Sequence, residues 1–219
     1  MQIEVIAKMD WKNHPLLQVE ENAEQQGKRP RVVDALCEYL THLLYVNDSA
    51  PACATAGDAL FAFESSEVPS ISIRSYVERW HTYSCCSSAC YVICYGWIKR
   101  LDLMQRITRR NIHRILLVSL VTACKLVDDI FMTQTFYARV GGIPVKELNC
   151  LEREFLYLLD YKLWSSEMFS NALMEMELDM EIAFDSFPAA ATSEHLSKCA
   201  SSREEGAFNF KKSSNFINV

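Results

Sequence analysis

The stretch of sequence that decides the fold runs from Asn111 to Leu163 and reads NIHRILLVSLVTACKLVDDIFMTQTFYARVGGIPVKELNCLEREFLYLLDYKL. Its first part, Ile112 to Val127, is apolar on nearly every side, and a helix of that kind must be surrounded by other helices. Its second part opens with Pro144, ends near Asp160 and carries apolar residues at helical spacing, at Leu148, Leu151, Phe155, Leu158 and Leu159. The sequence therefore predicts a central buried helix and an amphipathic helix, joined by a compact connector.

Each of these two helices carries a charge where the pattern would allow an apolar residue. Lys125 lies late in the buried helix, and Glu152 lies inside the amphipathic one. A lysine offers three donors and a carboxylate offers only acceptors, so the two together can hold both polar groups of a peptide backbone. The alternatives are a lysine that extends its charged end to solvent and a glutamate on a solvated helix face. We take the pair as the candidate functional site.

Helical patterns continue on both sides of this stretch, and no strand pair with turn chemistry interrupts them. Ser72 is a candidate N-cap for a helix that begins at Ile73, and Thr108 is a candidate N-cap for the central helix. Further helices are expected at 31–47, 87–103 and 135–139 and from Ser165 onward. The sequence predicts an all-α fold, a five-helix domain with the buried helix third and an accessory helix before it.

The organisation of the chain follows from where these patterns begin and end. Residues 1–30 show no helical period and are expected to form a flexible arm, and residues 31–60 hold the accessory helix and a linker rich in small residues. The helical domain is expected at 61–185. Residues 186–219 are rich in serine, alanine and charge, and we expect them to be disordered.

Composition excludes several classes of protein. The chain has 219 residues and a formal net charge of -6, which disfavours nucleic-acid binding because phosphate neutralisation requires clustered Lys and Arg. The uncharged apolar run Ile115 to Cys124 is too short to span a membrane, and no secretory signal is visible. Nine cysteines without such a signal are expected to be reduced thiols in an intracellular protein of the cytoplasm or nucleus.

The sequence favours neither a metal site nor a catalytic site. Asp128-Asp129 lacks the third acid that a metal-binding motif would supply. The cysteines near His81 lack the paired spacing of closed zinc sites, so we expect structural thiols at Cys85, Cys86, Cys90 and Cys94. No set of nucleophile, base and orienting group can be assembled, and no phosphate-binding glycine loop is present. The sequence predicts neither an enzyme nor a cofactor.

Several motifs together resemble one known family. The run Thr122-Ala-Cys-Lys-Leu-Val-Asp-Asp129 is similar to the end of the third helix of a cyclin box. Phe136-Tyr-Ala-Arg-Val-Gly-Gly-Ile143, followed by Glu147-Leu-Asn-Cys-Leu-Glu152, resembles the connector and fourth helix of the P/U-type (PHO-type) cyclins. Pro69-Ser-Ile-Ser-Ile73 and Asn111-Ile-His-Arg114 resemble that family's entries to the first and third helices. The resemblance spans about residues 61–173.

The resemblance implies a fold and a partner. It implies a single cyclin box and a non-catalytic subunit that binds and activates a cyclin-dependent Ser/Thr kinase as a heterodimer, in cell-cycle or nutrient-linked control. Matching the family's motif position by position, Lys125 and Glu152 would contact the backbone around the kinase's mobile helix. The apolar positions that would pack on that helix are Leu126, Leu156 and Leu163. The alternative is a cyclin-fold adaptor that assembles complexes without activating a kinase.

One position departs from the family's pattern. The family commonly has an acid in its second helix where this chain has Lys99, within Trp97-Ile-Lys-Arg100. The usual ion pair with the first helix cannot form, and we hypothesise that Glu78 in the first helix faces Lys99 instead.

Overall fold

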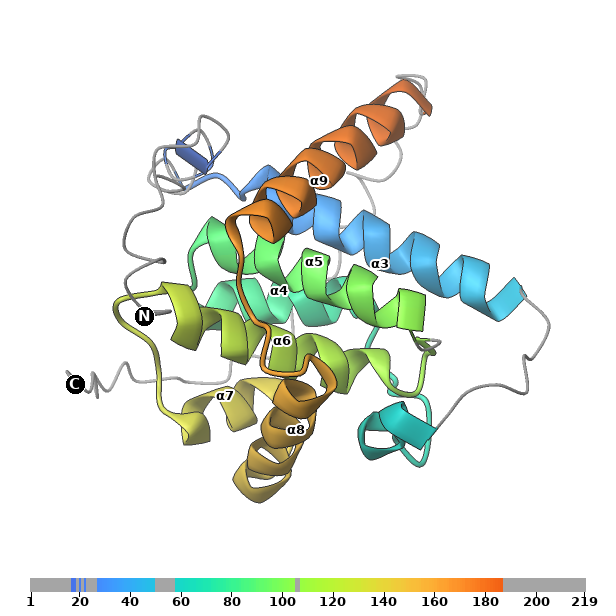
Figure 1. Ribbon diagram of the computed structural model, residues 1–219, viewed down its shortest axis with the longest axis vertical. Helices are drawn as coiled ribbons and strands as arrows, with labels where there is room; N and C mark the ends of the chain where they lie inside the picture. Colours follow the sequence, from blue (N-terminus) through green and yellow to red (C-terminus); the bar gives the residue numbers. More distant parts are fainter. Residues whose placement is uncertain are drawn as a thin grey trace, which may run out of the picture.

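The structure is a computed structural model that describes residues 17, 18, 20, 22, 27–49, 58–104 and 107–186. Throughout this part of the chain the regular structure is helical, as the sequence predicts (Figure 1). Its elements are α3 (Arg31–Ser49), the 3₁₀ helix η2 (Asp58–Phe63), α4 (Ile73–Ser84), α5 (Ser88–Met104), α6 (Ile112–Val127), α7 (Gln134–Gly141), α8 (Val145–Leu158) and α9 (Ser166–Ser186). The all-α prediction is therefore confirmed.

Helix α6 lies at the centre of the domain. It packs against α4, α5, α7, α8 and η2, and nearly all its residues from Ile112 to Cys124 are buried. The exceptions are His113 and Arg114 near its beginning, where the Arg114 guanidinium pairs with Glu147 of α8 at 2.8 Å. The central position predicted for this helix is confirmed, because its neighbours cover every side of it.

Helix α5 is buried more completely than its sequence pattern indicates. The pattern marks one apolar stripe, but Tyr91, Val92 and Tyr95 outside that stripe are buried as well. The cause is visible in Figure 1: α3 and α9 lie together over the side of α5 that faces away from α6. The domain thus has two buried helices, α5 and α6, with α3 and α9 on one side and α7 and α8 on the other.

Two predicted helix starts need correction. The N-cap of α6 is Asn111, not Thr108, because residues 108–111 form a turn in which the Thr108 N–H donates to the Asn111 side-chain oxygen at 2.8 Å. Pro144 is the N-cap of α8 rather than its first helical residue. The prediction at Ser72 is confirmed, since its hydroxyl accepts a hydrogen bond from the Ser75 N–H at 3.1 Å.

The segments predicted to be flexible fall mostly outside the described residues. Within the predicted arm at 1–30, Leu17 and Glu20 are buried, and a Glu20 carboxylate oxygen accepts a hydrogen bond from the Arg31 N–H. These two side chains therefore pack on the domain. Residues 50–57 of the predicted linker and residues 187–219 of the predicted tail lie outside the described part of the chain.

The Gly141-Gly142 pair performs two different tasks at the end of α7. Gly142 has φ +73, the left-handed conformation that closes a helix and that glycine adopts without strain. Gly141 lies against α6, where an added Cβ would be 2.3 Å from Leu117 Cδ2. The first glycine allows α7 to approach α6, and the second turns the chain into α8.

Candidate functional site

The structure brings Lys125 and Glu152 together. Lys125 Nζ, from the last turn of α6, lies 2.5 Å from Glu152 Oε1 on α8. The other oxygen of Glu152, Oε2, accepts a hydrogen bond of 2.7 Å from the Gln134 side-chain amide at the start of α7. Both charged side chains are partly buried, with 31% of Lys125 and 17% of Glu152 exposed. Three helices thus meet at one polar cluster, which we call the Lys-Glu site (Lys125, Gln134 and Glu152).

A hollow of about 420 Å³ opens over the Lys-Glu site. It is lined by Lys125, Phe131, Met132, Thr133, Gln134, Asn149 and Glu152. The connector between α6 and α7 supplies the apolar part of this wall, and 39% of Phe131 is exposed. The floor of the hollow is therefore polar, formed by the Lys-Glu site, and its edge is apolar, formed by the connector.

The connector is held in place by its own hydrogen bonds. The Thr133 hydroxyl accepts a bond from the Phe136 N–H at 3.3 Å and so caps α7, and the Met132 N–H donates to the Tyr137 hydroxyl at 3.0 Å. The ring of Tyr137 stacks on Trp80 with 5.4 Å between ring centroids. These bonds position Gln134, which sequence analysis did not identify. Its place is set by how the connector folds, and no periodic pattern marks it.

The three apolar residues expected at the site are only partly covered by the chain itself. Leu126 follows Lys125 on α6, and Leu156 lies one helical turn after Glu152 on α8, on the same face. Leu163 lies in the segment after α8, where its backbone oxygen accepts a bond of 3.0 Å from the Trp97 indole N–H. All three are half-buried. Nearby positions expose large apolar side chains, at Ile130 (60%) and Tyr157 (74%).

The hypothesis that Glu78 faces Lys99 is wrong. Lys99 Nζ pairs with Glu175 of α9 at 2.8 Å, whereas Glu78 binds the Arg29 guanidinium at 3.0 Å. Lys99 and Glu78 thus each form an ion pair with a residue outside α4 and α5. The reason is the same as for the burial of α5, because α9 lies directly along that helix.

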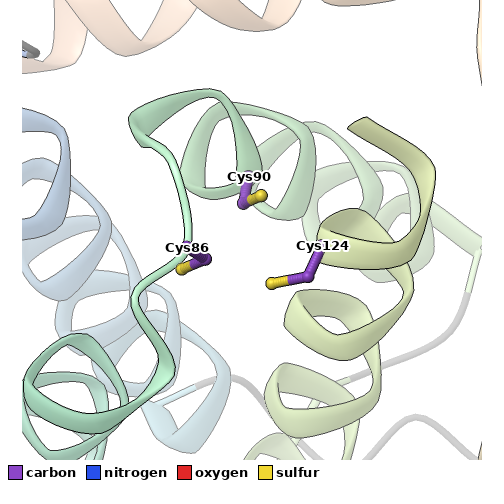
Figure 2. Close-up of side chains that lie close together, drawn as sticks. All are labelled: Cys86, Cys90 and Cys124. Carbon is purple, nitrogen blue, oxygen red and sulfur yellow. The ribbon is translucent and has the colours of Figure 1, made fainter. Parts of the chain in front are cut away.

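Asp128 and Asp129 do not act as a pair. Asp128 is the C-cap of α6, half-buried, and accepts a bond of 2.6 Å from the Ser87 hydroxyl, whereas Asp129 is exposed. Burial raises the pKa of Asp128. Of the cysteines near His81, Cys85 is exposed and Cys94 is buried against other residues, but Cys86 and Cys90 meet Cys124 of α6 (Figure 2).

No helix in the described ranges is both long enough and apolar enough to cross a membrane.

Comparison with known proteins agrees with the fold and with the motifs. The cyclin family model matches residues 19–163. Cyclin-U1-1 of Arabidopsis thaliana is 35% identical over 162 residues, which cover 72% of this chain and 77% of that protein. Cyclin-P4-1 of Oryza sativa subsp. japonica is 38% identical over 141 residues, covering 61% and 66% respectively. Cyclin-U4-1 of Arabidopsis thaliana is 36% identical over 143 residues, covering 62% and 71%.

The helical domain is built around a central buried helix, α6, and most of its sequence matches the cyclin family model. The chain therefore belongs to the cyclin family, whose members are regulatory proteins. Within the family it groups with the P/U-type cyclins, as its connector and fourth-helix motifs predicted.

Proposed function

We propose that this cyclin binds a cyclin-dependent Ser/Thr kinase through the Lys-Glu site and activates it, in cell-cycle or nutrient-linked control. The observation that carries the proposal is the Lys125–Glu152 pair at the floor of a hollow with an apolar edge. An isolated structural ion pair would not require an open hollow above it, or half-buried leucines such as Leu126 and Leu156 on the same two helices.

The pair keeps hydrogen-bonding capacity for a partner. Lys125 has three N–H donors, of which Glu152 takes one, and each carboxylate oxygen of Glu152 has a second lone pair. A peptide backbone that enters the hollow can therefore offer its C=O to Lys125 and its N–H to Glu152 without breaking the pair.

The apolar residues around the site would make those bonds stronger. Leu126, Leu156 and Leu163 are half-buried in the free chain, so a helix of the partner laid across them would complete their burial. Burying this edge excludes water from the charge-assisted bonds at the centre. A partner that recognises only the active arrangement of a kinase shifts the kinase population toward it, and the cyclin performs no chemistry itself.

The test compares the wild-type chain with a Lys125→Ala, Glu152→Ala double variant. Each is used to purify partners from the native cell extract, and the bound fraction is assayed for phosphorylation of a Ser-Pro peptide. We expect kinase activity with the wild type and loss of about 2 kcal/mol or more of binding free energy with the variant, roughly 30-fold in affinity.

The matched control removes another ion pair, Asp48–Arg109, whose atoms lie 2.5 Å apart beside the beginning of α6. The Asp48→Ala, Arg109→Ala variant should recover the same kinase activity as the wild type, because the pair lies at the opposite end of α6 from Lys125. If wild type and the Lys125, Glu152 variant recover the same partners and no kinase activity, the chain is a cyclin-fold adaptor and the site assignment is wrong.

A further inference from the structure

A cluster of three cysteine thiols lies near the C-terminus of α6, apart from the Lys-Glu site. The Sγ atoms of Cys86, Cys90 and Cys124 all lie within 4.8 Å of one another, and all three residues are buried. Figure 2 shows that they come from three segments: the turn before α5, the first turn of α5 and the last turn of α6. The Cys124 sulfur points from α6 toward the turn that carries Cys86.

A carboxylate lies against one of the thiols, outside the group whose ligand atoms all lie within 4.8 Å of one another. Asp128 Oδ2 lies 3.3 Å from the Cys90 sulfur, and Asp128 follows Cys124 by four residues at the end of α6. Cys86 and Cys90 are also four residues apart, which is a ligand spacing found in structural zinc sites. Two pairs with the same spacing thus meet across the α5–α6 interface.

We propose that Cys86, Cys90, Cys124 and Asp128 bind one structural Zn²⁺ ion in a tetrahedral site. Three thiolates and one carboxylate are ligands that suit zinc, whereas magnesium and calcium require oxygen ligands. In a tetrahedral site with zinc–sulfur bonds of about 2.3 Å the sulfurs are about 3.8 Å apart, so the thiols need to close by only about 1 Å. Small side-chain rotations provide that movement.

One of the three sulfurs lies among hydrogen-bond donors. The Cys86 sulfur accepts hydrogen bonds from the Trp80 indole N–H at 3.3 Å and from the Ser84 hydroxyl at 3.2 Å. The Ser87 hydroxyl donates to Asp128 Oδ1, and Oδ2 accepts from both the Ser87 N–H and the Cys90 thiol at 3.3 Å. Such bonds to the ligands orient them and offset their negative charge.

The ion would enter beside Cys86. A hollow of about 360 Å³ is lined by Gly27, Lys28, Arg29, His81, Cys85 and Cys86. Its two cationic side chains lie next to a site that would carry net negative charge with the ion bound. His81 is not among the residues whose ligand atoms all lie within 4.8 Å of one another, and its Nδ1 lies 3.2 Å from the Tyr91 hydroxyl. On binding, zinc displaces the thiol protons to solvent, so no oxidant or reductant is required.

Such an ion would join the turn before α5 to the last turn of α6. Cys124 directly precedes Lys125, so the ion would hold the turn that carries the lysine of the Lys-Glu site. Zinc binding is nevertheless independent of the proposed kinase binding, and its test does not involve a kinase.

The test titrates the reduced, full-length chain with Zn²⁺ against a chromophoric chelator, and in parallel with Co²⁺. We expect one ion per chain, and with Co²⁺ the thiolate-to-metal charge-transfer band and visible bands of a tetrahedral ion. Cys124→Ser should weaken binding at least tenfold, and Asp128→Asn should weaken it while keeping the thiolate band.

The matched control is Cys37→Ser, which alters an equally buried thiol of α3 outside the cluster. It should bind zinc as the wild type does. The proposal is overturned if the wild-type chain binds no stoichiometric metal, if Cys124→Ser binds as tightly as the wild type, or if mass spectrometry of the purified chain shows two of the three thiols joined in a disulfide. The Co²⁺ spectrum of the wild type decides the question even if a variant fails to fold.

Discussion

At the scale of single residues, three positions can be tested separately: a charge with a specific partner, a glycine with no space for a side chain, and a histidine held in its neutral form. Lys99, Gly141 and His113 are three such positions. Each lies at a contact between helices, so a substitution there tests a specific packing or charge relation rather than helix formation.

The first prediction concerns the partner of Lys99. With side chains 36% and 42% exposed, the Lys99–Glu175 pair should contribute only about 0.2–1 kcal/mol. A double-mutant cycle of Lys99→Ala and Glu175→Ala, measured by urea unfolding, should show coupling in that range. The cycle of Lys99→Ala with Glu78→Ala should show none, and coupling there would revive the hypothesis that the structure contradicts.

The second prediction concerns Gly141. Gly141→Ala should lower the free energy of unfolding by about 1–3 kcal/mol, because the new methyl group overlaps Leu117 in a close-packed core. Denaturant unfolding measures the loss. In a Leu117→Ala background the same substitution should cost clearly less, since the overlapping atoms are gone. An equal cost in both backgrounds would contradict the steric explanation.

The third prediction concerns pH. His113 Nε2 lies 3.0 Å from the Ile71 carbonyl oxygen, and Nδ1 is buried with no partner among the described residues. Burial lowers the pKa of His113 below its ordinary 6.5, so the folded protein holds the neutral ring with its proton on Nε2. Its contribution to stability is complete above pH 6.5 and is lost as pH falls toward the lower folded-state pKa, because the unfolded chain takes up the proton first.

This dependence can be isolated by comparing the wild type with His113→Gln, whose amide can still donate to Ile71. The difference in melting temperature between the two proteins should shrink as pH is lowered through 6.5. A difference that is constant with pH would show that His113 does not titrate on unfolding.

At the scale of helices, the short connector helix α7 determines the geometry of the Lys-Glu site. It begins with a side-chain cap at Thr133 and ends with a left-handed glycine at Gly142, so both its ends are defined. Between them it carries Gln134 toward Glu152 and Tyr137 toward Trp80. The helix therefore connects the core to the polar floor of the hollow.

The fourth prediction follows from that cap. Thr133→Ala should lower the free energy of unfolding by about 0.5–2 kcal/mol and should also weaken kinase binding, because the first turn of α7 carries Gln134. Ser72→Ala removes an equivalent cap from α4 and is the control. It should have a similar cost in stability without a change in kinase recovery. Equal effects of both variants on binding would indicate a general loss of stability.

At the scale of the whole molecule, α3 and α9 make α5 a core helix. Buried residues of α9, Phe169, Leu173 and Met176 among them, pack on the domain, and Asp179 accepts a bond of 2.7 Å from Tyr95 of α5. The match to the cyclin family model ends at residue 163, before α9 begins. The folded unit is thus larger than the matched region.

The fifth prediction is that a chain ending at Leu163 will not fold. Each fully buried apolar side chain of α9 contributes about 1.5–3 kcal/mol, so the loss is comparable to the whole stability of a typical domain. Circular dichroism and thermal unfolding measure it. A chain ending at Ser186, which keeps α9, should melt as the full chain does. Cooperative melting of the shorter chain would show that α9 is dispensable.

The sequence by itself determined the helical class and the central position of α6, and it identified Lys125 and Glu152 as a candidate site. These follow from local information, because the 3.6-residue period marks which faces are buried, and the motifs mark the family. The cap at Ser72 was predictable for the same reason, since it depends on a bond to a residue three positions away.

Only the tertiary structure decided which elements cover which faces. The burial of α5, the pairing of Lys99 with Glu175, and the meeting of Cys124 with Cys86 and Cys90 all depend on contacts between segments tens of residues apart. A periodic pattern reports that a face is buried but not what buries it. The position of Gln134 and the cluster of thiols therefore could not be predicted from the sequence. Each depends on which helices pack together, and the sequence of a helix does not identify its neighbours.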